Sequence, residues 1–82
     1  MNKLLIEVHV PAIGRTFDVS IPYNAKVLEL LPLITTAVVQ LSDGMFVPNS
    51  TVLCDGNTGA IYGNNMSVGE MQLRNGSRLI LI

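Results

Sequence analysis

Apolar residues recur with a helical period in one long window, residues 24–41. If successive residues are set about 100° apart, a set of apolar side chains shares one face of a helix. These are Val27, Leu30, Leu31, Ile34, Ala37, Val38 and Leu41. Asn24 stands before the run as a candidate N-cap, and Gly44 after it is free to close the helix in the left-handed conformation. The pattern therefore predicts one amphipathic helix over about residues 24–41.

Pro32 lies inside this predicted helix, where it lacks a donor N–H and costs about 3 kcal/mol. Burying the apolar face, at about 1.5–3 kcal/mol for each large side chain, outweighs that cost before conformational entropy is subtracted. We therefore expect a helix that is kinked or loosened at Pro32, or one that begins later than Asn24.

Residues 3–10 and 16–21 alternate between apolar and polar side chains with the period of two that is typical of strands. The apolar positions are Leu4, Ile6, Val8 and Val10 in the first segment, and Phe17, Val19 and Ile21 in the second. The loop between them, residues 11–15, contains Gly14, which is free to take a positive φ. Two alternating strands joined by so short a loop predict an antiparallel hairpin.

Shorter apolar segments follow the helix, and three of them are predicted to be strands: residues 51–55, 60–62 and 78–82. Ser67 and Glu70 have the spacing of a capping box, which indicates a short helical turn over residues 67–71. Because the first and last strands are the most apolar, we expect both in the middle of the sheet.

The order of elements is thus a hairpin, a helix, two strands, a short turn and a final strand. One main helix lying across one face of a mixed sheet of four to five strands satisfies this order, and this α+β arrangement is the β-grasp. Eighty-two residues are enough for one two-layer core and too few for two, so we expect residues 1–82 to form a single domain.

This order of elements resembles that of ubiquitin-like proteins. The last third of the chain, with VLCDG followed by MSVGEMQLRNGSRLILI, is similar to the YukD/EsaB group of small proteins encoded with type VII secretion systems. The resemblance implies a non-conjugating adaptor or accessory protein without enzymatic activity. It would act by protein–protein contact, with the cytoplasmic domain of a membrane component of a bacterial secretion system as its partner.

Ubiquitin and the related sulfur carriers act through a flexible C-terminal tail that ends in Gly-Gly, whereas this sequence ends on the apolar residues Leu79–Ile82. We therefore expect that the chain takes no part in conjugation or sulfur transfer. The alternative is a ubiquitin-like sulfur carrier or modifier whose Gly-Gly tail is missing here.

Composition narrows the class of protein further. Hydrophobic residues make up 49% and charged residues 13% of the chain, which excludes intrinsic disorder. The five basic residues are scattered and aromatic residues are few, so we expect no nucleic-acid partner. No apolar run reaches the roughly 18 residues of a membrane span, and the N-terminus has the pattern of a strand. We expect a cytoplasmic protein that does not insert into a membrane.

The residues with chemical potential do not form a catalytic group. His9 has only Glu7 nearby on the same strand face, which favours a solvated strand residue over a catalytic one. Cys54 is the only cysteine and alternates with Val52 as an inward position, so a buried thiol is expected. Residues 55–59 resemble part of a calcium loop but lack its terminal bidentate Glu, which favours a hairpin turn. We predict no catalytic, cofactor or metal site.

Outward-facing apolar residues are the stronger candidates for function. If the helix covers the apolar face of the first strand, alternation sends a second set to the open face of the sheet, with His9 beside it: Leu5, Leu53, Ile80 and Ile82. Ubiquitin-like proteins bind partners on this face, so we expect partner contact there. A homodimer through the same face, or coverage by a loop, is the alternative.

A second candidate patch lies on the flank of the predicted helix and consists of Leu28, Pro32 and Val39. The interpretation we favour is that the loop after Gly44 covers these three side chains with Met45 and Phe46.

Overall fold

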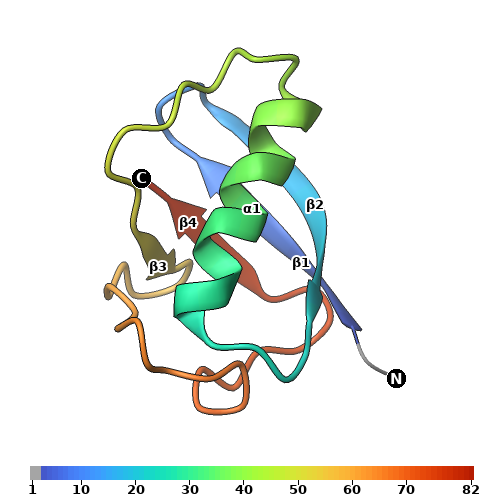
Figure 1. The fold of residues 1–82 in the computed structure, drawn as a ribbon, viewed down its shortest axis with the longest axis vertical. Helices are drawn as coiled ribbons and strands as arrows, with labels where there is room; N and C mark the ends of the chain where they lie inside the picture. The colour runs from blue at the N-terminus through green and yellow to red at the C-terminus, as the bar shows by residue number, and fades with distance from the viewer. Residues whose placement is uncertain (1–2) are drawn as a thin grey trace.

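The computed structural model describes residues 3–82, which form four strands and one helix. In chain order these are β1 (Lys3–Val10), β2 (Arg15–Pro22), α1 (Val27–Leu41), β3 (Leu53–Asp55) and β4 (Arg78–Leu81). The sheet has the order β2-β1-β4-β3, in which β1 is antiparallel to β2 and parallel to β4, and β3 is antiparallel to β4 (Figure 1). The predicted α+β β-grasp fold, with the first and last strands in the centre, is confirmed.

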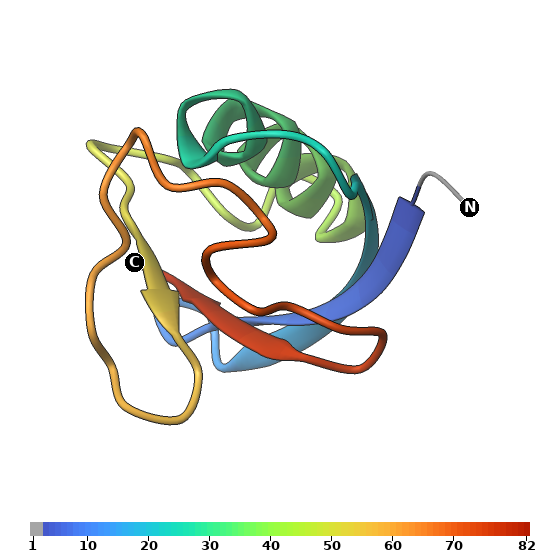
Figure 2. The same cartoon turned by 90° about the horizontal axis from the view of Figure 1, so that it is seen from below.

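The core lies between α1 and one face of the sheet, as Figure 2 shows with the helix above and the strands below. The strongest contributions come from the inward positions of β1 and β4 and from one face of α1. The fully buried side chains there are Ile6, Val8, Val10, Val27, Leu30, Ile34, Val38, Leu79 and Leu81. The alternation in β1 and β2 is thus confirmed, and it arises because only one face of each strand is covered.

The helix begins at Val27, so the prediction of an N-cap at Asn24 is wrong. The N–H groups of Val27 and Leu28 donate to the carbonyl oxygens of Met66 and Asn64, at 2.9 and 3.0 Å. The free donors of the first turn are therefore satisfied by a loop that is distant in the sequence, and a capping side chain before the helix is not needed.

Pro32 lies in the second turn, and α1 continues through it without interruption up to Leu41. The helix starts later than Asn24, at Val27, which is one of the two alternatives that the sequence left open. Pro32 deprives only the Leu28 carbonyl of an intrahelical donor. Leu28 and Pro32 are both exposed, so the missing hydrogen bond lies on the solvent side of the helix.

The C-terminal end of α1 differs from the prediction at Leu41, which is 51% exposed and does not belong to the buried face. Ser42 is buried in its place. Its hydroxyl donates to the Val39 carbonyl at 3.2 Å and accepts the N–H of Phe46 at 3.1 Å. These two bonds bring Phe46 into the core, while Gly44 takes the left-handed conformation that was predicted for it, at φ 78°.

Residues 60–62 form a single bridge rather than the predicted strand. Ile61 pairs with Cys54, and the N–H of Tyr62 donates to the Leu53 carbonyl at 2.9 Å. The capping box of the last third is confirmed, because the Glu70 carboxylate accepts the N–H of Ser67 at 3.0 Å and the Ser67 hydroxyl accepts that of Glu70 at 3.1 Å. The turn at residues 67–71 is therefore held by its own side chains.

Gly56 provides a test of the close packing at the end of the sheet. A Cβ atom there would lie 2.5 Å from the carbonyl oxygen of Arg78, which also accepts the N–H of Gly56 at 3.0 Å. We expect Gly56→Ala to lower the free energy of unfolding by about 1–3 kcal/mol, because the backbone must move to admit the methyl group. Urea denaturation measures this change.

The matched control is Gly63→Ala, since a Cβ at Gly63 meets nothing within 4 Å. This variant should be as stable as the parent or slightly more stable. Equal denaturation midpoints for the two variants would contradict the close approach of the two backbones at Gly56.

Candidate interaction surface and a polar pocket

The face of the sheet opposite α1 carries the predicted partner-binding residues of β1 and β4. Glu7 pairs with Arg78 and His9 with Ile80 in the parallel register, so these side chains share the outer face. Ile80 is half-buried and Ile82 is 52% exposed. The structure therefore places His9, Ile80 and Ile82 where the sequence predicted them.

Leu53 does not belong to this face, and its prediction as an outward residue is wrong. It is 1% exposed and pairs with Leu81, which packs against the core. The N–H of Val52 donates to the Ile82 carbonyl oxygen at 2.6 Å, and the N–H of Ile82 donates to that of Val52 at 3.1 Å. These two hydrogen bonds fix the register. Because Val52, Leu53 and Cys54 are all apolar, alternation alone could not assign their faces, and a shift of one residue reverses them all.

Cys54 is buried as predicted, at 2% exposure, but on the outer side of the sheet. It pairs with Ile80 on one side and with Ile61 on the other. Ile61, which the sequence analysis did not single out, is 68% exposed. Its assignment to this face required the long-range pairing with Cys54.

The two sides of β3 and β4 can be distinguished by their effect on stability. Leu53→Ala should lower the free energy of unfolding by about 2–5 kcal/mol, because it opens a cavity in the core. Ile82→Ala should lower it by less than about 1 kcal/mol, since half of that side chain already faces solvent. Chemical denaturation of both variants measures the difference, and similar losses would contradict the register.

Leu5 is exposed on the same face but is separated from the other apolar residues. The ion pair between Arg78 Nη2 and Glu7 Oε1, at 3.2 Å, lies between Leu5 and Ile80. Leu5 instead adjoins the turn of Asn75 and Gly76. Its N–H donates to Asn75 Oδ1 and its carbonyl oxygen accepts the N–H of Gly76, both at 2.8 Å. The predicted contiguous patch is therefore divided.

The apolar part of the outer face, termed the outer patch below, consists of Val52, Ile61, Ile80 and Ile82 around the buried Cys54. His9 lies at its border, where its Nδ1 is 3.0 Å from the Thr16 hydroxyl. The ion pair of Glu7 and Arg78 forms the polar margin. Both of its side chains are exposed, so it contributes at most about 1 kcal/mol to stability.

The second predicted patch, on the flank of α1, is not a single surface. Leu28 is 62% exposed and Pro32 is exposed, but Val39 is partly buried against the core, so its assignment to this patch is wrong. The loop after Gly44 supplies only Phe46 to the core, while Met45 remains 61% exposed. Pro32 instead borders a shallow hollow with Leu33, Thr36, Ala37 and Gln40.

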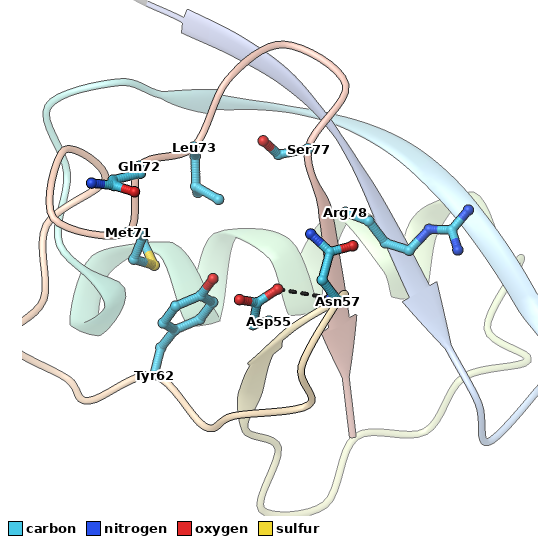
Figure 3. A pocket seen from close by; sticks show the side chains of 8 residues that line it. All are labelled: Asp55, Asn57, Tyr62, Met71, Gln72, Leu73, Ser77 and Arg78. Atoms are coloured by element: carbon cyan, nitrogen blue, oxygen red, sulfur yellow. Dashed lines mark hydrogen bonds between the residues drawn. The ribbon is translucent and has the colours of Figure 1, made fainter.

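A pocket of about 220 Å³ opens where the turn after β3 faces the loop before β4 (Figure 3). Its lining includes Asp55, Asn57, Tyr62, Met71, Leu73 and Arg78. Asp55 Oδ1 accepts the N–H of Asn57 at 2.8 Å, and its carbonyl accepts that of Gly59 at 2.8 Å. The predicted turn at residues 55–59 is confirmed. The pocket itself was missed, because it forms only when the loops of residues 55–62 and 71–78 fold against each other.

Tyr62 connects this pocket to the core, against which it packs. Figure 3 shows its hydroxyl near the Asp55 carboxylate, with Leu73 across the pocket. Burial raises the pKa of the Tyr62 phenol above its ordinary value of 10.0, and the negative charge of Asp55 raises it further, with a smaller electrostatic effect from Cys54. Tyr62 is therefore protonated and able to donate a hydrogen bond at neutral pH.

The raised pKa of Tyr62 predicts a loss of stability in alkali. The phenol ionises near 10.0 in the unfolded chain but keeps its proton to a higher pH in the folded one. Its contribution is therefore complete below pH 10.0 and is lost as the pH rises through the folded value. Tyr62→Phe should reduce this decline. Tyr23→Phe, which alters a tyrosine that is 55% exposed, should leave it as in the parent. Unfolding free energies measured across this range test the difference.

Over residues 3–82, no group of three or more His, Cys, Asp or Glu side chains is placed to hold a metal ion. Among the same residues, no helix combines the length and apolar content that crossing a membrane requires.

The fold is that of a ubiquitin-like protein. The ubiquitin-like domain of EccD5 from Mycobacterium xenopi superimposes with a TM-score of 0.80 at 17% identity, covering 100% of this chain and 94% of that one. The ubiquitin-like domain of the Mycobacterium tuberculosis type VII secretion system protein EccD1 gives a TM-score of 0.77 at 12% identity, covering 100% and 99%. At these identities the likeness establishes the fold alone.

The sequence profile described as "WXG100 protein secretion system (Wss), protein YukD" matches residues 5–81. The chain therefore belongs to the YukD family, as its last third indicated. A chain of the MycP5-free ESX-5 inner membrane complex also superimposes, with a TM-score of 0.81 at 18% identity; the match covers 100% of this chain and 21% of that one. No curated protein matches the sequence significantly.

Proposed function

We propose that this chain is a non-enzymatic accessory protein of a type VII secretion system, and that it acts in the cytoplasm by binding a membrane component of that system through the outer face of its sheet. The observation that carries the proposal is the outer patch. It is an apolar surface on the uncovered side of a small sheet, and it includes Ile61 at 68% and Ile82 at 52% exposure. Apolar surface grouped in this way is typical of protein–protein contact sites.

Membership of the YukD family supports a role in secretion. The similar domains of EccD5 and EccD1 support the choice of partner, since the latter belongs to a type VII secretion system protein. The similar chain in the ESX-5 inner membrane complex contains this fold as 21% of its length. A domain of this kind within a membrane complex favours a membrane component as the partner.

The placement of the reactive side chains favours contact over catalysis. His9 lies beside the Thr16 hydroxyl at 3.0 Å, and Cys54 is 2% exposed within the sheet. Nucleophilic catalysis requires a nucleophile and a base within hydrogen-bond reach of each other and of a substrate. Binding at the outer face needs only apolar area and a polar margin, and the sheet supplies both.

A specific complex would involve a substantial part of the surface of so small a chain. A standard interface covers about 800 Å² on each partner, or about one sixth of the 5045 Å² accessible surface of this chain. The outer patch would supply the apolar centre of such an interface. The Glu7–Arg78 ion pair and His9 would lie in its polar margin, where charges improve specificity more than affinity.

The test is the double variant Ile61→Asp with Ile82→Asp, which places two charges on the outer patch at positions that tolerate solvent. We expect the variant to fold and its affinity for the secretion partner to fall at least about thirtyfold, as for the loss of interface hot spots. Co-purification from native cells, with circular dichroism as a folding check, measures this.

Leu28→Asp is the matched control, because it adds a charge at an equally exposed apolar residue on α1. It should co-purify with the secretion components as the parent does. Loss of the partner in the α1 variant with retention in the sheet variant would contradict the assignment. Sedimentation of the free chain provides a second measurement, since a dimer abolished by the double variant would identify self-association as the role of this face.

A further inference from the structure

The outer edge of β2 is the longest strand edge that the sheet of residues 3–82 leaves unpaired. β2 stands at one end of the order β2-β1-β4-β3 and has eight residues. At the other end, β3 has only three residues, and the bridge of Cys54 with Ile61 occupies its outer side. The N–H and C=O groups along a free edge can pair with another extended chain.

The hydrogen bonds of β1 show which backbone groups of β2 point outward. The N–H of Glu7 donates to the Ser77 carbonyl, and the Leu5 carbonyl accepts the N–H of Gly76, both at 2.8 Å. The odd-numbered residues of β1 therefore turn their backbone groups toward β4, and the even-numbered ones turn theirs toward β2. These even-numbered residues pair with Arg15, Phe17, Val19 and Ile21. The other residues of β2 thus direct their backbone groups to the free edge: Thr16, Asp18, Ser20 and Pro22.

Pro22 agrees with this assignment and ends the ladder, because a proline in a strand is tolerated where its missing N–H would face outward. Edges that are protected from pairing are short, bulged or rich in lysine. β2 pairs with β1 at all eight of its positions without a bulge, and it contains no lysine. The edge is therefore open over Thr16, Asp18 and Ser20, each of which offers one donor and one acceptor.

The flank of α1 on the β2 side is apolar and incompletely covered. Leu33, Ala37 and Leu41 follow at every fourth position, and Leu33 and Leu41 are each 51% exposed. The opposite flank is turned toward the chain before β3, because the Thr35 hydroxyl lies 3.4 Å from that of Thr51. Figure 1 shows β3 on one side of α1 and β2 on the other. Apolar side chains on a strand added to β2 would therefore lie beside the Leu33 flank.

Asp18 determines the charge that fits this edge. It lies directly opposite Glu7 in the register of β1 and β2, and Glu7 is already paired with Arg78. Within residues 3–82, Asp18 itself forms no ion pair. A cation opposite Asp18 on an added strand would be favourable, whereas a second acid would not.

This charge also disfavours a second copy of β2 as the added strand. Opposite side chains of an antiparallel pair share one face, so self-pairing that uses Thr16 to Ser20 in full is centred on Asp18. That register places two Asp18 carboxylates opposite each other, and a shift in either direction shortens the ladder. The edge therefore fits a foreign segment better than its own copy.

We propose that the free edge of β2 binds an extended segment of a partner protein as an added antiparallel strand. The segment carries a lysine or arginine opposite Asp18, and the apolar residues on either side of it pack beside Phe17, Val19 and the Leu33 flank of α1. The backbone ladder supplies affinity, and the alternating side chains supply selectivity. This contact goes beyond the proposed function, because β2 and the outer patch lie at opposite ends of the sheet.

The experiment uses the isotopically labelled full chain and the probe peptide acetyl-Thr-Val-Lys-Val-Thr-amide, followed by amide hydrogen exchange in nuclear magnetic resonance. In the free chain, the amides of Thr16, Asp18 and Ser20 should exchange rapidly, while β1 protects those of Phe17 and Val19. We expect the peptide to slow the first three saturably, with a dissociation constant of about 1 mM. Absence of this protection, or protection in the free chain that rises with protein concentration and so indicates a dimer, would overturn the proposal.

Methylation of the peptide backbone separates a ladder from side-chain contact alone. A methyl group on the backbone nitrogen of lysine removes the N–H that faces the Asp18 carbonyl, so the protection should be lost. The same methyl group on the first valine, whose N–H faces away from β2, should be tolerated. Equal binding of the two methylated peptides would contradict the antiparallel ladder.

Asp18→Asn tests the charge at the edge. We expect it to weaken binding of the lysine peptide about two- to fivefold. Asp43→Asn, with the same change in net charge beyond the end of α1, should leave the affinity unchanged, and asparagine readily adopts the φ of 53° found there. Equal affinities of these two variants would overturn the charge assignment.

Leu33→Asp tests the flank of α1. It should weaken binding at least about fivefold, because a charge replaces the apolar surface beside the valines of the peptide. Leu28→Asp, at a residue that is 62% exposed and whose N–H donates to the Asn64 carbonyl, should bind as the parent does. Equal losses in both variants would contradict the position of the added strand.

This titration is independent of the secretion partner. If the peptide does not bind but co-purification still depends on Ile61 and Ile82, the strand site fails and the contact function stands. If the peptide binds and the double variant still co-purifies normally, the strand site stands and the outer patch is not the main contact.

Discussion

The packing of α1 against one face of the sheet is the constraint on which the rest of this structure depends. It divides every strand into a covered and an uncovered side, and so determines which apolar residues stabilise the fold. The position of α1 in turn depends on the loop at residues 63–67, whose carbonyl oxygens accept the first N–H groups of the helix. A segment late in the chain thus holds the start of the helix in place, and the helix buries the sheet.

The uncovered side of the sheet and the free edge of β2 are the two surfaces that this arrangement leaves available. The outer patch combines Val52, which precedes β3, with Ile80 and Ile82 at the end of the chain and with the bridge residue Ile61 into one apolar surface with a polar margin. The edge of β2 adds outward-pointing backbone groups beside the exposed flank of α1. A contact that used both would combine burial of apolar side chains with backbone hydrogen bonds that orient the bound segment.

The candidate site was only partly predictable, and each miss has its own physical reason. His9, Ile80 and Ile82 were assigned to the correct face. Inward and outward side chains alternate along β1 and β4, and His9 pairs with Ile80 on the outer face. Leu53 was assigned to the wrong face because three successive apolar residues carry no alternation. Leu5 was separated from the others by an ion pair between residues 71 positions apart, and Val39 proved to pack inward.

The sequence by itself determined the features that depend on neighbours along the chain. These are the helical period of α1, the alternation of β1 and β2, the capping box of Ser67 and Glu70, and the turn at residues 55–59, all of which rest on spacings of two to five residues. The tertiary structure decided the register of β3, the start of α1, the division of the outer face and the pocket. Each of these depends on pairings between distant segments, such as that of Val52 with Ile82 or of Val27 with Met66, which no local pattern encodes.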